Sequence, residues 1–208
     1  MISKTSLKRL LIYRNVMASL KTAGVLKTFS KNIGEVTGFT SSQVRKDFST
    51  YGITGNKRAG YSVMEIIEKI DQIFGRTSRR EVVLAGYGKL GAALIDYRGF
   101  GLDNIKIKAA FDIDPSKFRD GEVPVYPLDE MKSYIVRSGI TAGIITVPAE
   151  AAGNVYGIMV NAGIRGILNF APIRLKEKGD CYINNVNLAN ELENVMYFCN
   201  NTVNDENL

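Results

Sequence analysis

The most informative stretch of the chain is Val82-Val83-Leu84-Ala85-Gly86-Tyr87-Gly88-Lys89-Leu90-Gly91, an apolar run that leads into the spacing G-x-G-x-x-G. The residues after it, 92–95, favour a helix. Between a strand and a helix, this spacing is typical of a loop that binds a dinucleotide pyrophosphate. The first glycine permits the tight turn, the second lets the backbone approach the phosphates, and the third lets the helix pack against the strand. Free N–H groups at the start of the helix add further donors.

A carboxylate stands where such a domain holds the ribose of its ligand. The apolar run Ile105 to Phe111 ends at Asp112, 21 residues beyond Gly91, and the acidic residue of this fold follows the loop by about 20 residues. Asp112 would accept hydrogen bonds from the ribose hydroxyls and repel a 2′-phosphate, which favours NAD(H) over NADP(H). A glycine-rich structural turn is the alternative interpretation, and the combination of strand, helix and Asp112 argues against it.

Alternating strands and helices continue after Asp112. Apolar runs predict strands at 123–126, 143–148, 166–172 and 182–186, with helices at 129–137, 150–162 and 188–199. In an open parallel sheet the ligand lies beyond the carboxyl ends of the strands. The nicotinamide side of the site is therefore predicted in two loops, which hold Val147, Pro148, Asn169, Phe170 and Ala171.

The last predicted helix, from Leu188 to Cys199, is apolar on too broad a face for a solvent-exposed tail. Its apolar residues include Leu192, Val195 and Phe198. Such a face needs a partner, and a second subunit is the natural one. Packing against the helix's own domain is the alternative.

Charge divides the chain into two parts. Residues 1–80 hold fifteen Lys and Arg against five Asp and Glu, a net of +10, and residues 81–208 hold twelve against sixteen, a net of −4. Together they give the formal net charge of +6 at pH 7. A basic part joined to a mildly acidic one is typical of a chain of which one part meets a polyanion. A solvated basic surface is the alternative.

The basic part holds a helix-turn-helix pattern. Apolar residues between positions 7 and 20 follow helical spacing, and Gly24 ends that helix. Ser30 fits the N-cap of a short second helix that stops at Gly38. The next helix runs from Ser41 to Tyr51 and has polar and basic residues near its start. Two short helices joined by a tight turn, the second carrying polar residues at its amino end, are typical of a DNA-binding unit.

The residues predicted to contact DNA lie on this second helix and on the hairpin that follows. Gln43 and Arg45 have the chemistry to read base edges, and Lys46 suits a phosphate. The glycine-rich stretch Gly52 to Tyr61 is predicted to form a wing whose cations enter a minor groove. A further helix at 63–74 completes the domain. The full set of predicted DNA contacts is Ser42, Gln43, Arg45, Lys46, Lys57 and Arg58.

The composition excludes several classes of protein. A chain of 208 residues that is 45% hydrophobic and 23% charged suits two ordered domains. No apolar run approaches the ~20 residues of a membrane span, and the first residues do not resemble a signal peptide. With no histidine and only Cys181 and Cys199, neither a histidine-based catalytic site, a zinc site nor a disulfide framework is expected. We therefore expect a reduced, cytoplasmic, metal-free protein.

Over nearly its whole length the chain resembles the Rex family of redox-sensing transcriptional repressors. The resemblance implies a homodimer with a winged helix at each end and exchanged carboxy-terminal helices. It also implies competition between NAD⁺ and NADH, release from palindromic operators by NADH, and a position for Tyr97 near the nicotinamide. The motifs that carry it are residues 43–47, Gly60-Tyr61, Tyr97-Arg98-Gly99-Phe100, 111–115, 147–152 and 166–172.

The sequence departs from the family pattern at a pair of positions implicated in the switch between dimer states. Family members usually carry an arginine in the first helix and an aspartate, in an Asn-Val-Asp motif, that pairs with it across the dimer. The aligned positions here are Asn15 and Asn187, with Arg14 beside the first and Leu188 after the second. A charged pair has become two amides, which leaves DNA and dinucleotide binding in place and affects the strength of redox discrimination.

Three functions compete for this sequence. The main prediction is an α/β protein with a winged-helix DNA-binding domain (1–78), a Rossmann NAD(H) domain (79–186) and a dimerising helix with its tail (187–208), which acts as an NADH-responsive repressor. A DNA-binding paralogue with weak redox discrimination is the alternative. An NAD-dependent oxidoreductase is disfavoured, because hydride transfer to a carbonyl needs an acid or base. Without histidine only Tyr97 and Lys89 are available, and no substrate domain follows Pro172.

Overall fold

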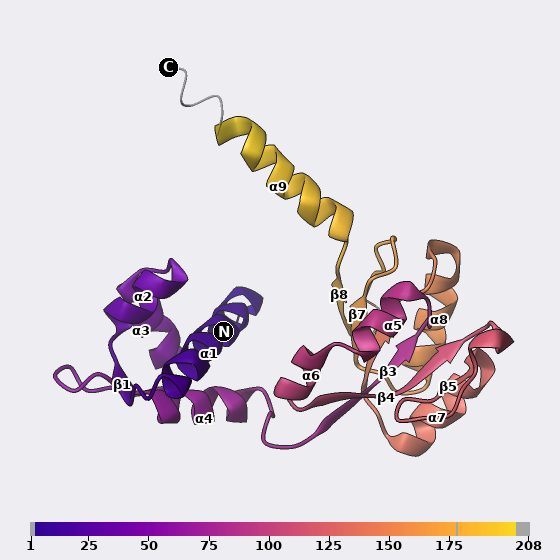
Figure 1. The fold of residues 1–208 in the computed structure, drawn as a ribbon, viewed down its shortest axis with the longest axis horizontal. Coiled ribbons are helices and arrows are strands. Elements are labelled where there is room, and N and C mark those ends of the chain that lie inside the picture. Colours follow the sequence, from indigo (N-terminus) through magenta and orange to yellow (C-terminus); the bar gives the residue numbers. More distant parts are fainter. Residues whose placement is uncertain (1–2, 178, 203–208) are drawn as a thin grey trace. The chain divides into compact units, whose positions relative to one another are not determined.

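The computed structural model describes residues 3–177 and 179–202, and Figure 1 shows the helices and strands. Residues 1–2 of the amino-terminal segment and 203–208 of the predicted tail lie outside the described residues. The chain divides between Ser78 and Arg79 into two compact units. Each unit has its own hydrophobic core and is described by itself.

The first unit consists of helices around one core and a short two-stranded ribbon. Its elements are α1 (Lys4–Thr22), β1 (Lys27–Thr28), α2 (Ser30–Thr37), α3 (Ser41–Thr50), β2 (Tyr61–Ser62) and α4 (Val63–Ile73). The apolar faces of the helices meet in the core, where the rings of Tyr13 and Phe48 pack edge to face with centroids 5.5 Å apart. Gly38 ends α2 with a φ of +75°, a conformation that glycine adopts without strain. The predicted helix-turn-helix is therefore present as α2 and α3.

Two local features of this unit differ from the expectation. Ser30 is the first residue of α2 and not its N-cap, because Phe29 holds the cap position in an extended conformation. The sequence also gave no sign of β1, which pairs antiparallel with β2 so that Thr28 lies opposite Tyr61. A strand of two residues is too short to show a periodic pattern, so only the folded chain reveals it.

The second unit is a parallel six-stranded sheet covered by helices. Its elements are β3 (Arg80–Ala85), α5 (Lys89–Ile95), α6 (Arg98–Leu102), β4 (Ile105–Asp112), the 3₁₀ helix η1 (Pro115–Lys117), β5 (Val125–Pro127), η2 (Leu128–Glu130), α7 (Met131–Ser138), β6 (Ala142–Ile145), α8 (Ala149–Asn161), β7 (Gly166–Asn169), β8 (Tyr182–Asn185) and α9 (Leu188–Thr202). The strand order is β5-β4-β3-β6-β7-β8, and each of these pairings is parallel.

The order of the strands positions the site. The first strand, β3, lies between β4 and β6, so the chain moves outward on both sides of it. Side chains alternate along β3: Val83 and Ala85 face the core that α7 and α8 cover, and Leu84 faces the core beneath α5 and α6. The carboxyl ends of β3, β4 and β6 therefore meet at one edge, where an open sheet of this kind binds its ligand.

The connections contain two features that the sequence did not indicate. The short helix α6 follows Tyr97, although two of its five residues are glycine, a poor helix former. Residues 113–124, all of them described, cross from β4 to β5 with only the 3₁₀ helix η1, so one parallel connection lacks the usual α-helix.

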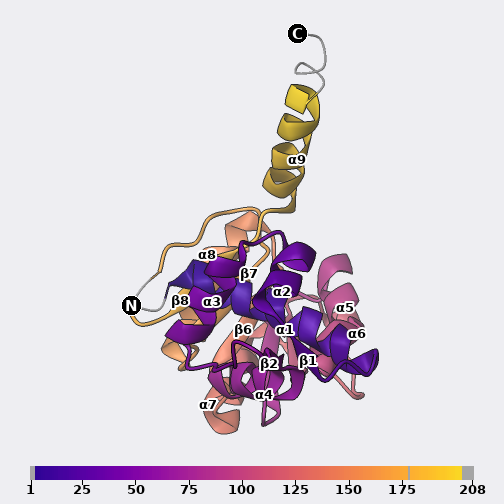
Figure 2. The same ribbon diagram turned by 90° about the vertical axis from the view of Figure 1, so that its left-hand side faces the viewer.

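Helix α9 leaves its apolar residues exposed. Both views show it extending away from the six-stranded sheet (Figure 1, Figure 2). Leu192, Val195 and Phe198 are 60%, 57% and 65% exposed, values far from those of a packed core. The chain alone therefore provides no cover for this helix within the described residues.

Candidate functional site

The glycine loop between β3 and α5 has the geometry that a pyrophosphate requires. Gly86 has a φ of +98°, and a Cβ there would lie 2.8 Å from the carbonyl of Thr146, so only glycine fits. A Cβ on Gly91 would collide with the carbonyl of Gly86, which shows how closely α5 approaches the loop. Gly88, in contrast, is exposed, and a Cβ there would meet no atom within 4 Å. The open space above Gly88 is where a dinucleotide's phosphates would approach the backbone.

Asp112 ties this loop to the end of β4. Its carboxylate is 7% exposed and accepts hydrogen bonds from the backbone N–H groups of Tyr87, at 2.7 Å, and Asp114, at 3.0 Å. The Lys117 ammonium lies 3.1–3.2 Å from both carboxylate oxygens. No sequence motif pointed to Lys117, although it lies only five residues downstream on η1. Its charge offsets part of the repulsion that Asp112 alone would exert on a 2′-phosphate.

An open hollow of about 420 Å³ adjoins Asp112. Its lining is mostly apolar and comes from the ends of β4 and β5 and from α8, namely Asp112, Ile113, Phe118, Pro127, Leu128, Asp129, Asn154 and Ile158. A hollow of this kind, beside the carboxylate that is predicted to bind the ribose, suits a flat aromatic base such as adenine. The sequence contained a signal for it, since the loop after β4 and the helix after β6 flank the adenosine end in this topology.

The loops predicted to hold the nicotinamide flank the other side of the glycine loop. Thr146, which the sequence analysis did not single out, donates its hydroxyl to the carbonyls of Ala85 and Gly86 at 3.0 and 2.7 Å. Val147 is half-buried and Pro148 is exposed at the start of α8. The end of β6 is therefore fixed directly against the phosphate loop.

Asn169 shapes the loop after β7 through its own hydrogen bonds. The side chain is 0% exposed, and its amide donates to the carbonyl of Ile173 and to the side chain of Asn185, both at 2.9 Å. Its oxygen accepts the N–H of Ala171 at 3.0 Å. Of the three residues predicted here, Phe170 is half-buried and Ala171 is buried. The amide of Asn169 is thus committed to holding this loop.

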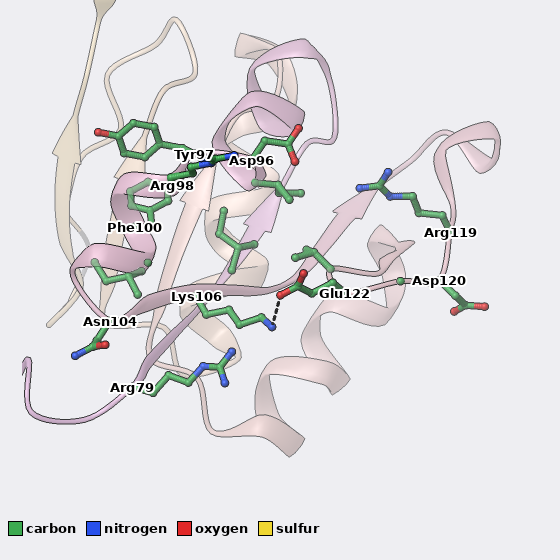
Figure 3. Close-up of a pocket in the computed structure, with 16 residues that line it drawn as sticks. Arg79, Asp96, Tyr97, Arg98, Phe100, Asn104, Lys106, Arg119, Asp120 and Glu122 are labelled. Atoms are coloured by element: carbon green, nitrogen blue, oxygen red, sulfur yellow. Dashed lines mark hydrogen bonds and ion pairs between the residues drawn. The ribbon is translucent and has the colours of Figure 1, made fainter.

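Tyr97 occupies a different surface of the same unit. Its ring is 58% exposed and packs edge to face on Phe100, with centroids 5.1 Å apart. Both residues line a hollow of about 870 Å³ beside α6 and β4 (Figure 3), across which Lys106 and Glu122 form an ion pair at 2.9 Å. The glycines of the phosphate loop are absent from this lining. Tyr97 therefore lies in a hollow that the glycines of the phosphate loop do not line.

The outer face of α3 carries the predicted DNA contacts. Ser42, Arg45 and Lys46 are exposed, and the Arg45 guanidinium donates to the hydroxyls of Ser30, at 3.2 Å, and Ser42, at 3.1 Å. Thr40 caps the helix by accepting the N–H of Gln43 at 3.1 Å. The amino end of α3 thus presents hydroxyls and two cations on one surface.

Beneath that face lies a buried polar cluster around Asp47, which is 3% exposed. Its carboxylate accepts two hydrogen bonds from the Arg9 guanidinium, at 2.6 and 2.7 Å, one from the Tyr13 hydroxyl at 2.9 Å, and one from the Gln43 amide at 2.9 Å. Burial alone would raise the pKa of Asp47, but the hydrogen bonds from Arg9, Tyr13 and Gln43 together lower that pKa below its usual value. Asp47 therefore stays ionised and joins α3 to α1.

The predicted wing forms a tight hairpin. Asn56 and Gly60 exchange backbone hydrogen bonds of 2.9 and 2.8 Å, and the Asn56 side chain accepts the N–H of Arg58 at 2.7 Å. Lys57 and Arg58 are exposed at the tip. A Cβ on Gly60, whose φ is +75°, would collide with the carbonyl of Thr28, so the base of the hairpin is closely packed.

The two amides predicted to act in the switch lie in different units. Asn15 is exposed on α1. Asn187 is the cap of α9, since its side-chain oxygen accepts the N–H groups of Ala189 and Asn190 at 3.0 and 3.2 Å. Leu188, the first residue of α9, is 61% exposed. Arg14 pairs with Asp71 of α4 at 3.0 Å, so its charge is used within the first unit.

Across residues 3–177 and 179–202, no three acidic or cysteine side chains gather in a way that could hold a metal ion. No helix in the described part of the chain has the length and apolar character needed to cross a membrane.

Known proteins resemble this chain over both units. Residues 77–173 match a family model described as a CoA binding domain, and residues 1–49 match one described as a putative DNA-binding protein N-terminus. The redox-sensing transcriptional repressor Rex of Streptococcus agalactiae serotype Ia is 35% identical over 203 residues, which covers 96% of this chain and 97% of the relative. The protein of the same description from Lactobacillus acidophilus is 36% identical over 200 residues, 95% of this chain and 94% of the relative.

Solved structures of a Rex-family repressor resemble the fold of this chain. RSP, a Rex-family repressor, in complex with β-NAD⁺ and operator DNA has a TM-score of 0.92 at 30% identity, covering 100% of this chain and 96% of RSP. RSP in complex with β-NADH has a TM-score of 0.88 at 29% identity, covering 100% and 98%.

Proposed function

Because the chain belongs to the Rex family of redox-sensing transcriptional repressors, we propose that its second unit binds NAD(H) at the loop of residues 86–91 and that its first unit binds operator DNA through α3 and the wing. The protein is an NADH-sensing, DNA-binding repressor and not an enzyme. One observation carries the assignment of the sites. This observation is that the same chain contains both a glycine loop with open space above Gly88 and a helix, α3, with polar and basic residues near its amino end.

The NAD(H) site follows from the sheet edge. The backbone of residues 86–91 would hold the pyrophosphate, Asp112 the adenosine ribose, and the hollow beside Ile113 and Asn154 the adenine. Val147 and Pro148, together with the Phe170–Ala171 loop, would form the nicotinamide side. Tyr97 is also proposed as a nicotinamide contact, as the resemblance to the Rex family implies.

The DNA surface follows from the charge and exposure of α3 and the wing. Arg45 and Gln43 would read base edges. Lys46 and Ser42 would bind the phosphates of the DNA backbone. Lys57 and Arg58, exposed at the hairpin tip, would enter the neighbouring minor groove. We infer a cytoplasmic protein, because a repressor must reach the DNA that it binds.

We propose a homodimer that is held together by α9. The helix exposes Leu192, Val195 and Phe198 together, and a second copy offers the same apolar face. A two-fold dimer would also match a palindromic operator, since each subunit then reads one half-site. Sedimentation velocity tests this: the wild type should sediment as a dimer and Val195→Asp as a monomer, and a monomeric wild type would contradict the proposal.

A second candidate, a repressor with weak redox discrimination, rests on Asn15 and Asn187. Both are neutral, and the side-chain oxygen of Asn187 is already used to cap α9. A pair of amides contributes less to one dimer state than a charged pair does, because hydrogen bonds between charged groups are stronger.

An operator titration separates the two candidates. A duplex selected by the protein from a palindromic library is labelled, and its release is followed by fluorescence anisotropy while NAD⁺ or NADH is added separately. Release by NADH at much lower concentration than by NAD⁺ supports the redox-sensing repressor. Equal release supports weak discrimination, and failure to bind any duplex would contradict both.

A further inference from the structure

We propose that Asp47 is a positioning residue that holds the side-chain amide of Gln43 in one orientation, so that Gln43 reads an adenine in the major groove. The inference rests on the proposed DNA-binding function and goes beyond it, since it names a base and the residue that sets the preference. Four observations within the first unit lead to it.

The first observation is the contact itself. The Gln43 amide nitrogen, Nε2, lies 2.9 Å from Oδ1 of Asp47, one turn further along α3. Asp47 cannot move to suit a different partner, because Arg9 holds both of its oxygens from α1 at 2.6 and 2.7 Å and Tyr13 holds one of them at 2.9 Å. The carboxylate is therefore a fixed point against which Gln43 must arrange itself.

The second observation concerns which end of the amide faces Asp47. An ionised carboxylate only accepts hydrogen bonds, whereas a glutamine amide has a donating nitrogen and an accepting oxygen. The oxygen of Gln43 would be repelled by Asp47, so the nitrogen must face it. The arginine partner keeps Asp47 charged, and the pKa of this carboxyl is below its usual value. The two ends of a glutamine amide have nearly the same shape, and the hydrogen bond to Asp47 therefore determines which end is the nitrogen.

The third observation is what the amide still offers. A glutamine amide has one N–H beside its oxygen and one on the side away from it. The proposal assigns the N–H on the far side to Asp47, so that the other N–H and the oxygen lie side by side as a donor and an acceptor. In the major groove, adenine presents N7 as an acceptor beside its N6 donor, and guanine presents two acceptors. Adenine therefore satisfies both free positions of Gln43, and guanine satisfies only one.

The fourth observation is the place of Gln43 on the helix. It is the third residue of α3, its backbone N–H is held by the Thr40 cap at 3.1 Å, and its side chain is half-buried at the border of the exposed face. The amino-terminal residues of a recognition helix are those that meet base edges. Arg45, in contrast, donates to the hydroxyls of Ser30 and Ser42, and its guanidinium has no accepting atom whose orientation a neighbour could set.

The first part of the experiment tests whether Gln43 confers a preference for adenine. The full-length protein selects duplexes from a palindromic library with randomised half-sites, and Gln43→Ala is treated in the same way. We expect one position in each half-site at which the wild type prefers adenine by about 10-fold or more and at which Gln43→Ala has lost that preference alone. Replacing this adenine with 7-deazaadenine, which lacks N7, should weaken the wild type and leave Gln43→Ala unchanged.

The second part asks whether Asp47 sets the preference. Asp47→Asn can donate as well as accept, so Gln43 can turn, and the adenine preference should fall toward that of Gln43→Ala. Tyr13→Phe is the matched control: it removes another hydrogen bond to the same carboxylate and leaves the contact with Gln43. It should lower stability and keep the adenine preference. If Asp47→Asn does not fold, Gln43→Glu replaces it. A glutamate side chain at position 43 cannot donate to Asp47. This variant should therefore lose the preference for adenine and prefer cytosine at the same position.

The outcomes separate the inference from the function on which it rests. A wild type that selects no duplex contradicts the proposed function. A wild type that selects a sequence, but shows no adenine dependent on Gln43, overturns the inference alone. An adenine preference that is equal in the wild type and in Asp47→Asn, or one that survives in Gln43→Glu, overturns the positioning role.

Discussion

Asp112 serves two purposes at the carboxyl end of β4. It holds the N–H of Tyr87, and with it the phosphate loop, and it lies at the edge of the hollow proposed for adenine. Lys117 accompanies it at 3.1–3.2 Å, so the site contains a cation as well as an anion where the ribose would bind. Arg119 adds a second cation, with its guanidinium 4.7 Å from the centre of the Tyr87 ring.

Cofactor choice should change when Asp112 is replaced with alanine. The ribose hydrogen bonds and the tie to the loop are lost together, and a hydrogen bond to a charged group contributes ~1.5–3 kcal/mol, so the affinity for NADH should fall about 10- to 100-fold. The affinity for NADPH should fall less, because Lys117 is released to pair with the 2′-phosphate. Calorimetric titration with both dinucleotides measures the change.

The matched control is the double variant Asp112→Ala with Lys117→Ala. It should bind NADPH more weakly than Asp112→Ala does, because the released cation is gone. A ratio of NADH to NADPH affinity that is the same in all three proteins would mean that the ribose does not lie at Asp112.

Two glycines of the same loop should respond in opposite ways to a larger side chain. Gly88→Val places its side chain in open space, so the free energy of unfolding should change by about 1 kcal/mol or less while NADH binding is lost. Gly91→Ala must displace the carbonyl of Gly86 and should lower the melting temperature before any ligand is added. Thermal melts and calorimetry on both variants test this, and tight NADH binding by Gly88→Val would show that the loop is misassigned.

Among the elements, α3 depends on α1 for its position. The ion pair of Arg9 and Asp47, at 2.6 Å, joins them beneath the DNA-binding face. Its side chains are 17% and 4% exposed, so solvent weakens it less than it would a surface pair. The element that meets DNA is therefore fixed from below by charge as well as by the apolar core of Tyr13, Val44 and Phe48.

The stability of the first unit should depend on pH through Asp47. Its pKa in the folded protein lies below the 3.8 of a free carboxyl, so its contribution to stability is complete well above pH 3.8 and is lost as the pH falls from there through the pKa of the folded state. Asp47→Asn should lower the free energy of unfolding by about 3–5 kcal/mol at neutral pH, and the difference from the wild type should shrink in acid. Urea unfolding at a series of pH values measures this, and a difference that does not vary with pH would contradict it.

The two cations of α3 should differ in their effect on DNA binding. Lys46→Ala should weaken binding to all sequences and reduce the salt dependence by about one unit, as the loss of one phosphate contact does. Arg45→Ala should cost ~1–3 kcal/mol and relax the preference at one base pair. Titrations at several salt concentrations, against the selected and a scrambled duplex, distinguish these effects. Equal and sequence-independent losses would show that Arg45 does not read a base.

In the whole molecule, the redox response of the proposed dimer would depend on a balance between two dimer states. A ligand shifts such a balance only by its difference in affinity for the two states. Asn15 is exposed on α1 and Asn187 is the cap of α9. The resemblance to the Rex family implies that they stand where family members carry a charged pair. Two amides can still hydrogen-bond, with a contribution of roughly 0.5–1.5 kcal/mol. We therefore expect NADH to release this repressor with a smaller advantage over NAD⁺ than the charged pair would provide.

Restoring the pair should sharpen the switch. Asn15→Arg combined with Asn187→Asp should increase the ratio of the NADH and NAD⁺ effects, and either change alone should impair it by leaving one charge without a partner. Aspartate also caps a helix, so Asn187→Asp should leave α9 intact. Operator titrations of the wild type, both single variants and the double variant form a complete cycle. Strictly additive effects would mean that the two positions do not meet.

Local patterns were sufficient to predict much of this protein. The run from Val82 to Gly91 indicated a strand, a phosphate loop and a helix because their spacing reflects the geometry of one continuous segment. The helix-turn-helix and the strands of the sheet followed for the same reason, and the fold class is confirmed by the Rex structures. The sequence did not indicate β1 or α6, since elements of a few residues carry too little periodicity. It also placed the N-cap of α2 at Ser30, one residue too late.

The partners of the functional side chains emerged only from the folded chain. Arg9 and Asp47 are 38 residues apart, and Thr146 and Ala85 are 61 apart. No spacing rule links such residues, because a hydrogen bond depends on ångström-scale positions that are set by how strands and helices pack. The sequence thus determined which chemistry each unit carries. The packing determined that Lys117 accompanies Asp112, that Asn169 holds its own loop, and that Asp47 orients Gln43.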